Sequence, residues 1–262
     1  MEFKNILFEI KDQVAYVTIN QPEKRNPVGN DTKQELMAAF DECDFNDEIR
    51  AMVLRGAGGI FSAGGDIKVM HKRIEEGKLG TKISCRLGAN LNERLRNVKK
   101  PTIACVEGAA AGSGMCLALS CDFQIVEETA KLVFSFVNIG YVPDSGATFL
   151  VTRAVGTVRA TELLMSGRKF TGREAADMGL FTTAVPKEEL ENTLNKYITK
   201  YANGPTVAYG YIKSMINHAS YAQFASGMEH EIEFQGMCER TEDHKTAVRA
   251  FLNKERPKFI GK

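Results

Sequence analysis

Two runs of alternating apolar and polar residues open the chain, at 6–10 and 14–19. The polar tripeptide Lys11-Asp12-Gln13 separates them, and this pattern predicts a β-hairpin. Shorter and mostly apolar runs, typical of buried strands, follow at 51–55, 102–106, 122–126 and 132–134. The first half of the chain is therefore expected to contain a β-sheet.

Two pairs of residues have the spacing of a capping box, in which a Thr and a Glu three positions later cap the start of a helix. Thr32 and Glu35 form the first pair and predict a helix that runs to about residue 43. Thr171 and Glu174 form the second pair, and Gly179 is the expected end of that helix. The two pairs thus indicate where two helices begin.

Helical periodicity also extends through 67–98, with a break expected around 77–80, and a further helix is predicted after Pro143, running through Ala147 to Val155. Beyond residue 187 the pattern is helical throughout, at 188–202, 205–218, 221–238 and 242–253. This order predicts an α/β fold of repeated ββα units over 1–186, followed by a helical region over 187–262.

The charges of the chain are balanced, with 34 basic and 33 acidic residues and a formal net charge of +1. No run of five like charges occurs, which disfavours nucleic acid and acidic membrane as partners. The first residues lack the pattern of a signal or transit peptide, and the apolar runs are too short to cross a bilayer. We therefore expect a cytoplasmic protein that binds neither nucleic acid nor membrane.

The cysteines and histidines do not indicate a metal site. None of the six cysteines belongs to a Cys-x-x-Cys pair, and none has zinc-finger spacing to a histidine, so reduced thiols are expected. A surface or interface position is expected for the histidines, which are His71, His218, His230 and His244. Glu107 is expected to form a structural ion pair.

Small residues follow the predicted strand at 102–106, since the chain breaks at Gly108 and an apolar helix is predicted from Ser113. Small residues let the backbone come close to a bound group. The unpaired N–H groups at the start of a helix suit an anionic oxygen. Ser113 is therefore expected to act through its backbone N–H. A nucleophilic serine would require Gly-x-Ser-x-Gly, but Ala111 and Met115 occupy the outer places.

A second bend of the same type lies at 61–67 and contains Gly64 and Gly65. Paired glycines also occur in simple tight turns. Two backbone donors from separate loops, however, are what an oxyanion hole requires. The two bends together predict a site that stabilises negative charge on a substrate oxygen. No Gly-x-Gly-x-x-Gly motif opens a helix, so a dinucleotide cofactor is not expected.

Six segments carry a family resemblance, and they occupy 20–26, 61–67, 108–122, 152–156, 175–180 and 251–259. In this order they are similar to the crotonase, or enoyl-CoA hydratase/isomerase, superfamily over nearly the full length of the chain. The resemblance implies a spiral core of ββα units and C-terminal helices that form trimers, often paired into hexamers. It also implies an acyl-CoA thioester as ligand, with coenzyme A as part of the substrate and no separate cofactor.

The resemblance assigns roles to individual residues as well. It implies that the backbone N–H groups of Gly65 and Ser113 form the oxyanion hole. The loop that contacts coenzyme A falls on Lys24, Arg25 and Val28, and the pantetheine and adenine side falls on Ala63, Asp66, Ile67 and Lys68. For Lys24 and Arg25 the alternative is a solvated loop.

The chain departs from the hydratases of this family, which use a pair of glutamates. Cys116 and Phe136 occupy those positions here, and neither side chain can activate water. Asp144 remains, at a position where family members that move double bonds carry a catalytic Asp. Alternatively, Asp144 caps the helix predicted from Ser145. Phe136 and Tyr141 are expected to line the acyl pocket.

These features predict an acyl-CoA enzyme, and in particular an enoyl-CoA double-bond isomerase of fatty acid metabolism. Asp144 would move the proton while Gly65 and Ser113 hold the thioester oxygen of an enolate. The alternatives are hydration by an unusual constellation, thioester hydrolysis, decarboxylation, or a non-catalytic protein that binds CoA esters. A homotrimer or a dimer of trimers is the expected assembly.

Overall fold

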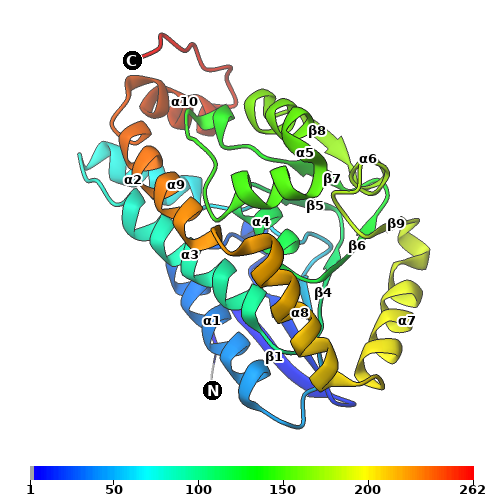
Figure 1. Ribbon diagram of the computed structural model, residues 1–262. Coiled ribbons are helices and arrows are strands. Elements are labelled where there is room, and N and C mark those ends of the chain that lie inside the picture. Colours follow the sequence, from blue (N-terminus) through cyan, green and yellow to red (C-terminus); the bar gives the residue numbers. More distant parts are fainter. Residues whose placement is uncertain (1–2) are drawn as a thin grey trace.

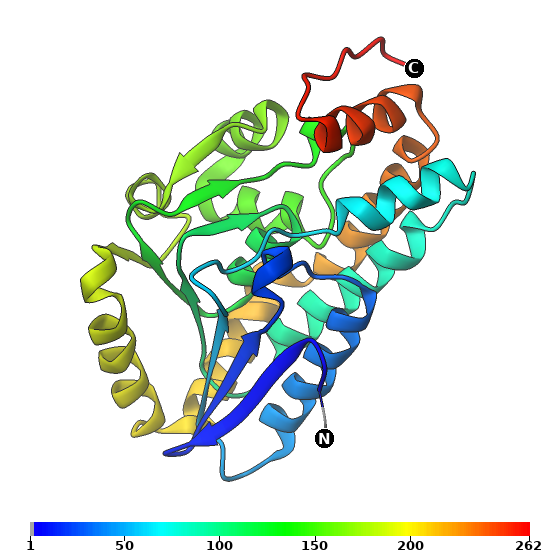
Figure 2. The ribbon, with the colours of Figure 1, turned by 180° about the vertical axis from the view of Figure 1, so that it is seen from behind.

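A six-stranded sheet runs through the computed structural model, which describes residues 3–262 (Figure 1, Figure 2). Its strands, in spatial order, are β1 (Ile6–Lys11), β2 (Val14–Ile19), β3 (Ala51–Gly56), β4 (Thr102–Val106), β6 (Phe123–Glu127) and β9 (Thr183–Val185). β1 and β2 form the predicted antiparallel hairpin, and the other neighbours are parallel. The intervening helices provide the long connections that parallel strands need.

Helices cover both faces of this sheet. Successive residues of a strand point to opposite faces. Ile103 packs in the cluster beneath α7 (Leu190–Ala202), whereas Ala104 belongs to the main core with α1 (Asn30–Phe45) and α3 (Thr81–Asn97). Figure 2 shows α7, in yellow, standing apart from α1 and α3 on the other side of the strands. This enclosure explains the continuous apolar run of β4, all of whose residues are buried.

A second sheet of three short strands continues the spiral. It consists of β5 (Ala109–Ala111), β7 (Lys131–Val133) and β8 (Lys169–Thr171). The buried helix α4 (Ser113–Ser120) starts just after β5. The capping box predicted at Thr171 and Glu174 is confirmed at the start of α6 (Gly172–Asp177), where each residue accepts a hydrogen bond from the backbone N–H of the other.

The capping box predicted at Thr32 and Glu35 is wrong, because α1 begins at Asn30 and has no side-chain cap. Thr32 Oγ1 instead accepts a hydrogen bond from Gln21 Nε2 at 3.0 Å. Glu35 Oε2 accepts from Asn5 N at 2.8 Å. Both side chains therefore tie α1 to segments that precede it rather than to its own first turn.

Glycines determine where two other predicted helices are interrupted. The helical stretch predicted at 67–98 consists of α2 (Ile67–Glu75) and α3, and the break expected between them is confirmed. α5 (Ala147–Ser166) is longer than predicted, because the helix resumes after one non-helical residue, Gly156, at φ 74° and ψ 168°. Glycine adopts this conformation without steric cost.

The last part of the chain is helical, as predicted. It contains α7, α8 (Thr206–Tyr221), α9 (Phe224–Cys238) and α10 (Glu242–Asn253). α9 packs against α3 and α5, and α10 packs against α2 (Figure 1). Short 3-10 helices lie at Pro22–Lys24, Val137–Ile139 and Lys187–Glu189. Within residues 3–262 no helix is long and apolar enough to cross a membrane.

Candidate active site

The two glycine-rich bends lie directly against each other. Ala111 N donates a hydrogen bond to Ser62 O at 3.0 Å. Gly64, at φ +81°, comes so close to the second bend that a Cβ atom would lie 2.4 Å from Ala111 O and 3.3 Å from Ser113 N. Only glycine fits at this position, and the close approach fixes Gly65 beside the start of α4.

The amides of Gly65 and Ser113 are free donors in this arrangement. Their neighbours are engaged, since Gly64 N donates to a serine hydroxyl at 3.1 Å and Gly112 N donates to Val133 O at 3.0 Å. By contrast, Gly65 N and Ser113 N have no protein acceptor within residues 3–262. Two free N–H groups from separate loops fit the requirement for an oxyanion hole. The structure thus brings the two predicted donors together, and their catalytic role stays a prediction.

Two cavities open beside these amides. The first, which we call the main cavity, has a volume of about 520 Å³. The predicted residues that line it are Arg25, Ala63, Gly65, Ile67, Ser113, Phe136, Tyr141 and Asp144. The second, which we call the adjoining cavity, has a volume of about 390 Å³, and the predicted residues around it are Lys24, Val28, Gly65, Asp66, Ser113 and Asp144. Lys68 is exposed and lines neither cavity.

Asn26 holds the loop that carries Lys24 and Arg25. The Asn26 side chain is fully buried. Its Oδ1 accepts from Gln21 N at 2.9 Å, and its Nδ2 donates to two backbone carbonyls beyond β3 at 2.8 and 2.6 Å. Lys24 and Arg25 are exposed and have no ion-pair partner among residues 3–262. The loop is therefore rigidly anchored and presents two free cations at the edges of the cavities.

Asp144 lines both cavities, and its two carboxylate oxygens have different partners. Ser145 Oγ donates to Asp144 Oδ1 at 2.9 Å. Cys85 Sγ donates to Asp144 Oδ2 at 3.4 Å. Ser145 has a φ of +59°, which is uncommon for a residue other than glycine, so the chain turns sharply just after Asp144. This turn directs the carboxylate into the site and the following residues into α5.

The alternative prediction, that Asp144 caps the next helix, is wrong. α5 begins at Ala147, and its cap position is Gly146, which lacks a side chain. Among residues 3–262 the hydrogen bonds of the Asp144 carboxylate come from Ser145 and Cys85, and neither is an amide of α5.

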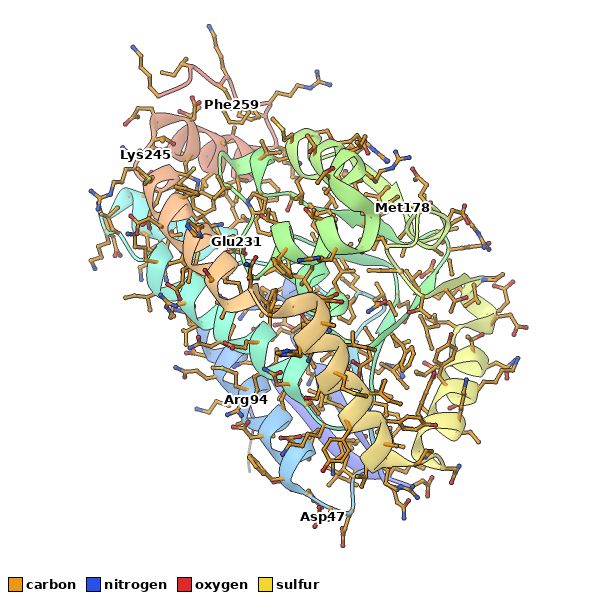
Figure 3. The ribbon with its side chains drawn as sticks, viewed as in Figure 1. Asp47, Arg94, Met178, Glu231, Lys245 and Phe259 are labelled. Atoms are coloured by element: carbon orange, nitrogen blue, oxygen red, sulfur yellow. The ribbon has the colours of Figure 1, made fainter. Side chains whose placement is uncertain are left out.

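Glu231 of α9 caps α5 instead (Figure 3). Its carboxylate oxygens accept from Gly146 N at 2.8 Å and from Thr148 N at 2.9 Å. The side chain is only 7% exposed. Burial raises the pKa of Glu231 to about 7, although the two amides favour the ionised form. The loop that carries Asp144 is thereby fixed by a distant carboxylate, which no local motif could reveal.

Glu231 is the first of three buried polar residues spaced four apart, of which Gln235 also lies on α9 and Glu239 directly follows its last residue. Gln235 Nε2 donates to Val142 O at 3.0 Å, and Gln235 Oε1 contacts Cys85 Sγ. Glu239 accepts from the two amides at the start of α3, both at 2.9 Å. We call these three residues the polar face of α9. It holds both the loop before α5 and the start of α3, which are two walls of the site.

Tyr141 is a fixed part of the wall of the main cavity. Its hydroxyl shares a hydrogen bond with Thr81 Oγ1 at 2.8 Å, and its ring stacks on His244 at 3.7 Å between centroids. The surface position expected for His244 is wrong, since it is 1% exposed and its Nδ1 lies 2.7 Å from Ile139 O. The residue belongs to the side of α10 that packs against the 137–139 segment. Burial raises the pKa of Tyr141 and lowers that of His244.

The two positions that hold glutamates in the hydratases of this family offer no carboxylate. Phe136 lines the main cavity. Cys116 is fully buried, with its Sγ 3.4 Å from Gly112 O, and burial raises the pKa of its thiol.

The structural ion pair predicted for Glu107 is confirmed, with Lys187 Nζ at 2.8 Å. In the described part of the chain no group of three or more His, Cys, Asp or Glu residues could hold a metal ion.

Lys33 is a residue of the site that the sequence interpretation missed. It lines the adjoining cavity, and its Nζ donates to Ser84 O at 2.8 Å and to Ser84 Oγ at 2.9 Å. A signal was present, because Lys33 occupies the apolar stripe of α1 that continues with Leu36, Phe40 and Cys43. A lysine on such a stripe is buried when it has a polar partner.

Fold and site together define a cavity in which a carbonyl oxygen can receive two N–H donors next to a carboxylate, as in enzymes that stabilise an enolate. Comparison with known families agrees with this class. The family model for enoyl-CoA hydratase/isomerase matches residues 9–262. The chain therefore belongs to the enoyl-CoA hydratase/isomerase family of the crotonase superfamily, as its motifs predicted.

Some relatives are named isomerases and others hydratases. The trans-2-decenoyl-acyl-carrier-protein isomerase of Streptococcus mutans is 32% identical over 100% of both chains. The short-chain-enoyl-CoA hydratase of Clostridium acetobutylicum is 34% identical over 98% of this chain and 97% of that protein. A crystal structure of an enoyl-CoA hydratase from Mycobacterium avium subsp. paratuberculosis gives a TM-score of 0.90 at 27% identity, covering 99% of this chain and 100% of that chain. The reaction must therefore be argued from the site itself.

Proposed function

We propose that this protein is an isomerase that moves a double bond within an enoyl thioester. The proposal rests on which acidic side chains line the two cavities. Among residues 3–262, Asp144 is the only acidic residue that lines both the main and the adjoining cavity. Hydration would need a second carboxylate, and Cys116 and Phe136 stand where the hydratases of this family have theirs. The other acid that lines the main cavity, Glu255, is an exposed residue beyond the end of α10.

The proposed reaction starts from a 3-enoyl thioester whose carbonyl oxygen accepts hydrogen bonds from Gly65 N and Ser113 N. The Asp144 carboxylate removes a proton from C2, and the electron pair moves onto the oxygen to give a dienolate. Protonated Asp144 then returns the same proton to C4, and the double bond forms between C2 and C3. One carboxylate suffices for both transfers. The reaction is redox-neutral, so it requires no redox cofactor.

Coenzyme A is the carrier that we propose for the acyl group. Lys24 and Arg25 lie at the edges of the two cavities, where free cations can bind phosphates. The Streptococcus mutans relative is named for a substrate on acyl carrier protein. The same acyl group should therefore be offered on both carriers, and faster turnover of the coenzyme A ester is the expected result.

The test compares isomerisation with hydration. Conversion of 3-enoyl-CoA to conjugated 2-enoyl-CoA is followed by absorbance, and loss of conjugation from 2-enoyl-CoA reports hydration. We expect isomerisation to dominate and Asp144→Asn to lower its kcat by about 10²- to 10⁴-fold, the typical contribution of a general base. Asp47→Asn, an exposed change, serves as the control (Figure 3). Hydration as fast as isomerisation, or an active Asp144→Asn enzyme, would refute the proposal.

A further inference from the structure

Three lysines are buried in the part of the chain that the structure describes, and one of them lies in the active site. Lys213 forms an ion pair with Asp122 at 2.8 Å. Lys100, 8% exposed, donates to two backbone carbonyls at 3.0 and 3.1 Å. Lys33, 6% exposed, lines the adjoining cavity together with the free amides and Asp144. Burying an ammonium group is costly, so its location beside a reactive carboxylate requires an explanation.

The contacts of Lys33 place its charge close to Asp144. Ser84, which accepts two hydrogen bonds from Lys33 Nζ, is followed in the chain by Cys85. Cys85 Sγ in turn donates to Asp144 Oδ2 at 3.4 Å. The adjacent residues Ser84 and Cys85 therefore connect the ammonium of Lys33 to the carboxylate of Asp144.

Gly88 of α3 lies close to both Lys33 and Ser145, the residue that follows Asp144. A Cβ atom at Gly88 would lie 2.7 Å from Ser145 Oγ and 3.8 Å from Lys33 Nζ. The hydroxyl that binds Asp144 Oδ1 and the ammonium of Lys33 therefore flank the same residue. Glycine at this point of α3 leaves room for both groups.

No carboxylate within residues 3–262 lies within ion-pair distance of Lys33 Nζ, which donates its hydrogen bonds to Ser84. Burial lowers the pKa of Lys33 below its ordinary value, and Arg73 lowers it further, although Asp144 and Cys85 favour the charged form. The charged or titratable groups around Lys33 and Asp144 come from several elements. They are Lys24, Asp31 and Asp66 at the adjoining cavity, Arg25, Lys131, Tyr141, Lys169 and Glu255 at the main cavity, Arg73 on α2, Cys85 on α3, Cys116 on α4, Glu231 on α9 and Glu239 just after it. Of the cations in this set, Lys33 is the one that is buried.

We propose that Lys33 is the fixed counter-charge of the proton shuttle and keeps Asp144 ionised when substrate fills the cavity. This inference rests on the proposed function. An acyl chain displaces water from the carboxylate, and loss of water disfavours the charged form of an acid, an effect that a nearby cation offsets. Coulomb attraction in a partly buried site is strong enough for this. Lys33 acts through Asp144 and is in that sense a positioning residue.

The first experiment measures the pH profile of kcat for isomerisation in Lys33→Met, Lys33→Arg and Lys100→Met. Lys100→Met is the matched control, because it removes an equally buried lysine that lies outside both cavities. For Lys33→Met we expect the acidic limb to move to higher pH by about one unit, so that kcat falls by up to about 10-fold at pH values below the limb and by less at pH 9. Lys33→Arg should restore the wild-type limb, and Lys100→Met should leave it unchanged. A uniform loss in Lys33→Met, without displacement of the limb, would overturn the proposal.

A second readout does not depend on turnover. A 3-ketoacyl-CoA can bind as its enolate, which carries negative charge on the oxygens and absorbs in the ultraviolet. Removal of a nearby cation should raise the pH at which the bound enolate forms, so we expect a shift to higher pH in Lys33→Met and none in Lys100→Met. If the wild-type protein failed to isomerise enoyl-CoA but this shift occurred, only the proposed reaction would be wrong. If isomerisation depended on Asp144 and no shift occurred, only the role of Lys33 would be wrong.

Discussion

Ser113 is the first residue of α4, and this position explains why its N–H is free. A helix leaves its first amides without internal partners. The preceding Gly112 has a φ of 50° and a ψ of −121°, which turns the chain from β5 into the helix. The side chain of Ser113 makes no capping hydrogen bond in the described chain. The backbone donor and the hydroxyl can therefore be separated by substitution.

Proline and alanine at Ser113 should have opposite effects. Proline fits the first position of a helix, so Ser113→Pro removes the N–H while α4 can still form. We expect it to lower kcat/KM by about 10²- to 10³-fold, the typical cost of losing one oxyanion-hole donor. Ser113→Ala keeps the N–H and should retain most activity. Steady-state kinetics with circular dichroism as the folding control measures both, and an alanine variant as inactive as the proline variant would assign the chemistry to the hydroxyl.

Sequence patterns identified the site residues that act through a backbone conformation set by their neighbours in the chain. Gly65 and Ser113 lie in short glycine-rich segments, and the backbone conformation of such segments follows from neighbouring residues. Lys33 was recoverable only as a polar residue on the apolar stripe of α1. Glu231 was not recoverable, because its two partners lie more than 80 positions earlier in the chain. Long-range pairing of this kind depends on tertiary packing, which a single sequence does not display.

At the scale of elements, α9 connects the helical region to the active site. Its polar face binds the start of α5 through Glu231, residue 142 through Gln235 and the start of α3 through Glu239. Strands and helix boundaries were mostly predictable from periodicity and glycines, and β1 to β4 lie close to where the pattern placed them. The first capping box failed because Thr32 and Glu35 bind segments outside α1, and side-chain spacing alone does not distinguish the two uses.

Glu231 should make the stability of the protein depend on pH. Its pKa is raised from 4.5 to about 7 in the folded protein, so the folded state binds this proton more tightly than the unfolded state does. The associated stability is fully present below pH 4.5 and is lost as pH rises towards 7, by about 3 kcal/mol in all. In Glu231→Gln this contribution to the slope should be absent. Urea unfolding at pH 5, 6, 7 and 8 gives the difference in the free energy of unfolding between wild type and variant.

That difference should change steadily between pH 5 and pH 7 and level off above. A constant difference over the whole range would show that Glu231 keeps an ordinary pKa. Glu239→Gln is the structural comparison, because Glu239 is similarly buried and also caps a helix. It shows how much stability the loss of one capping carboxylate removes at a single pH.

At the scale of the whole molecule, α8 leaves a row of large apolar side chains uncovered. Val207 is 74% exposed, Tyr211 69% and Met215 63%. Exposed apolar surface of this kind is typical of association. With the family resemblance, it predicts a trimer or a dimer of trimers.

Light scattering at micromolar concentration measures this assembly. Tyr211→Glu and Met215→Glu together should lower the molar mass to that of smaller species, because burying two carboxylates in an interface is unfavourable. Val158→Glu is the control, since Val158 is 87% exposed and lies on α5. A wild-type protein that remains monomeric at this concentration would contradict the prediction.

The two amides and the carboxylate reach the site from different parts of the chain. Gly65 and Ser113 belong to the interlocked bends between the two sheets, where a Cβ at Gly64 would collide with the neighbouring backbone. Asp144 belongs to a loop that α9 holds from outside those bends. Under the proposed mechanism, changes in this loop alter the group that moves the proton, while the two amides can still stabilise an enolate oxygen. Because the amides and the carboxylate lie in separate segments, related enzymes can acquire new reactions through a few substitutions in this loop that leave the two bends unchanged.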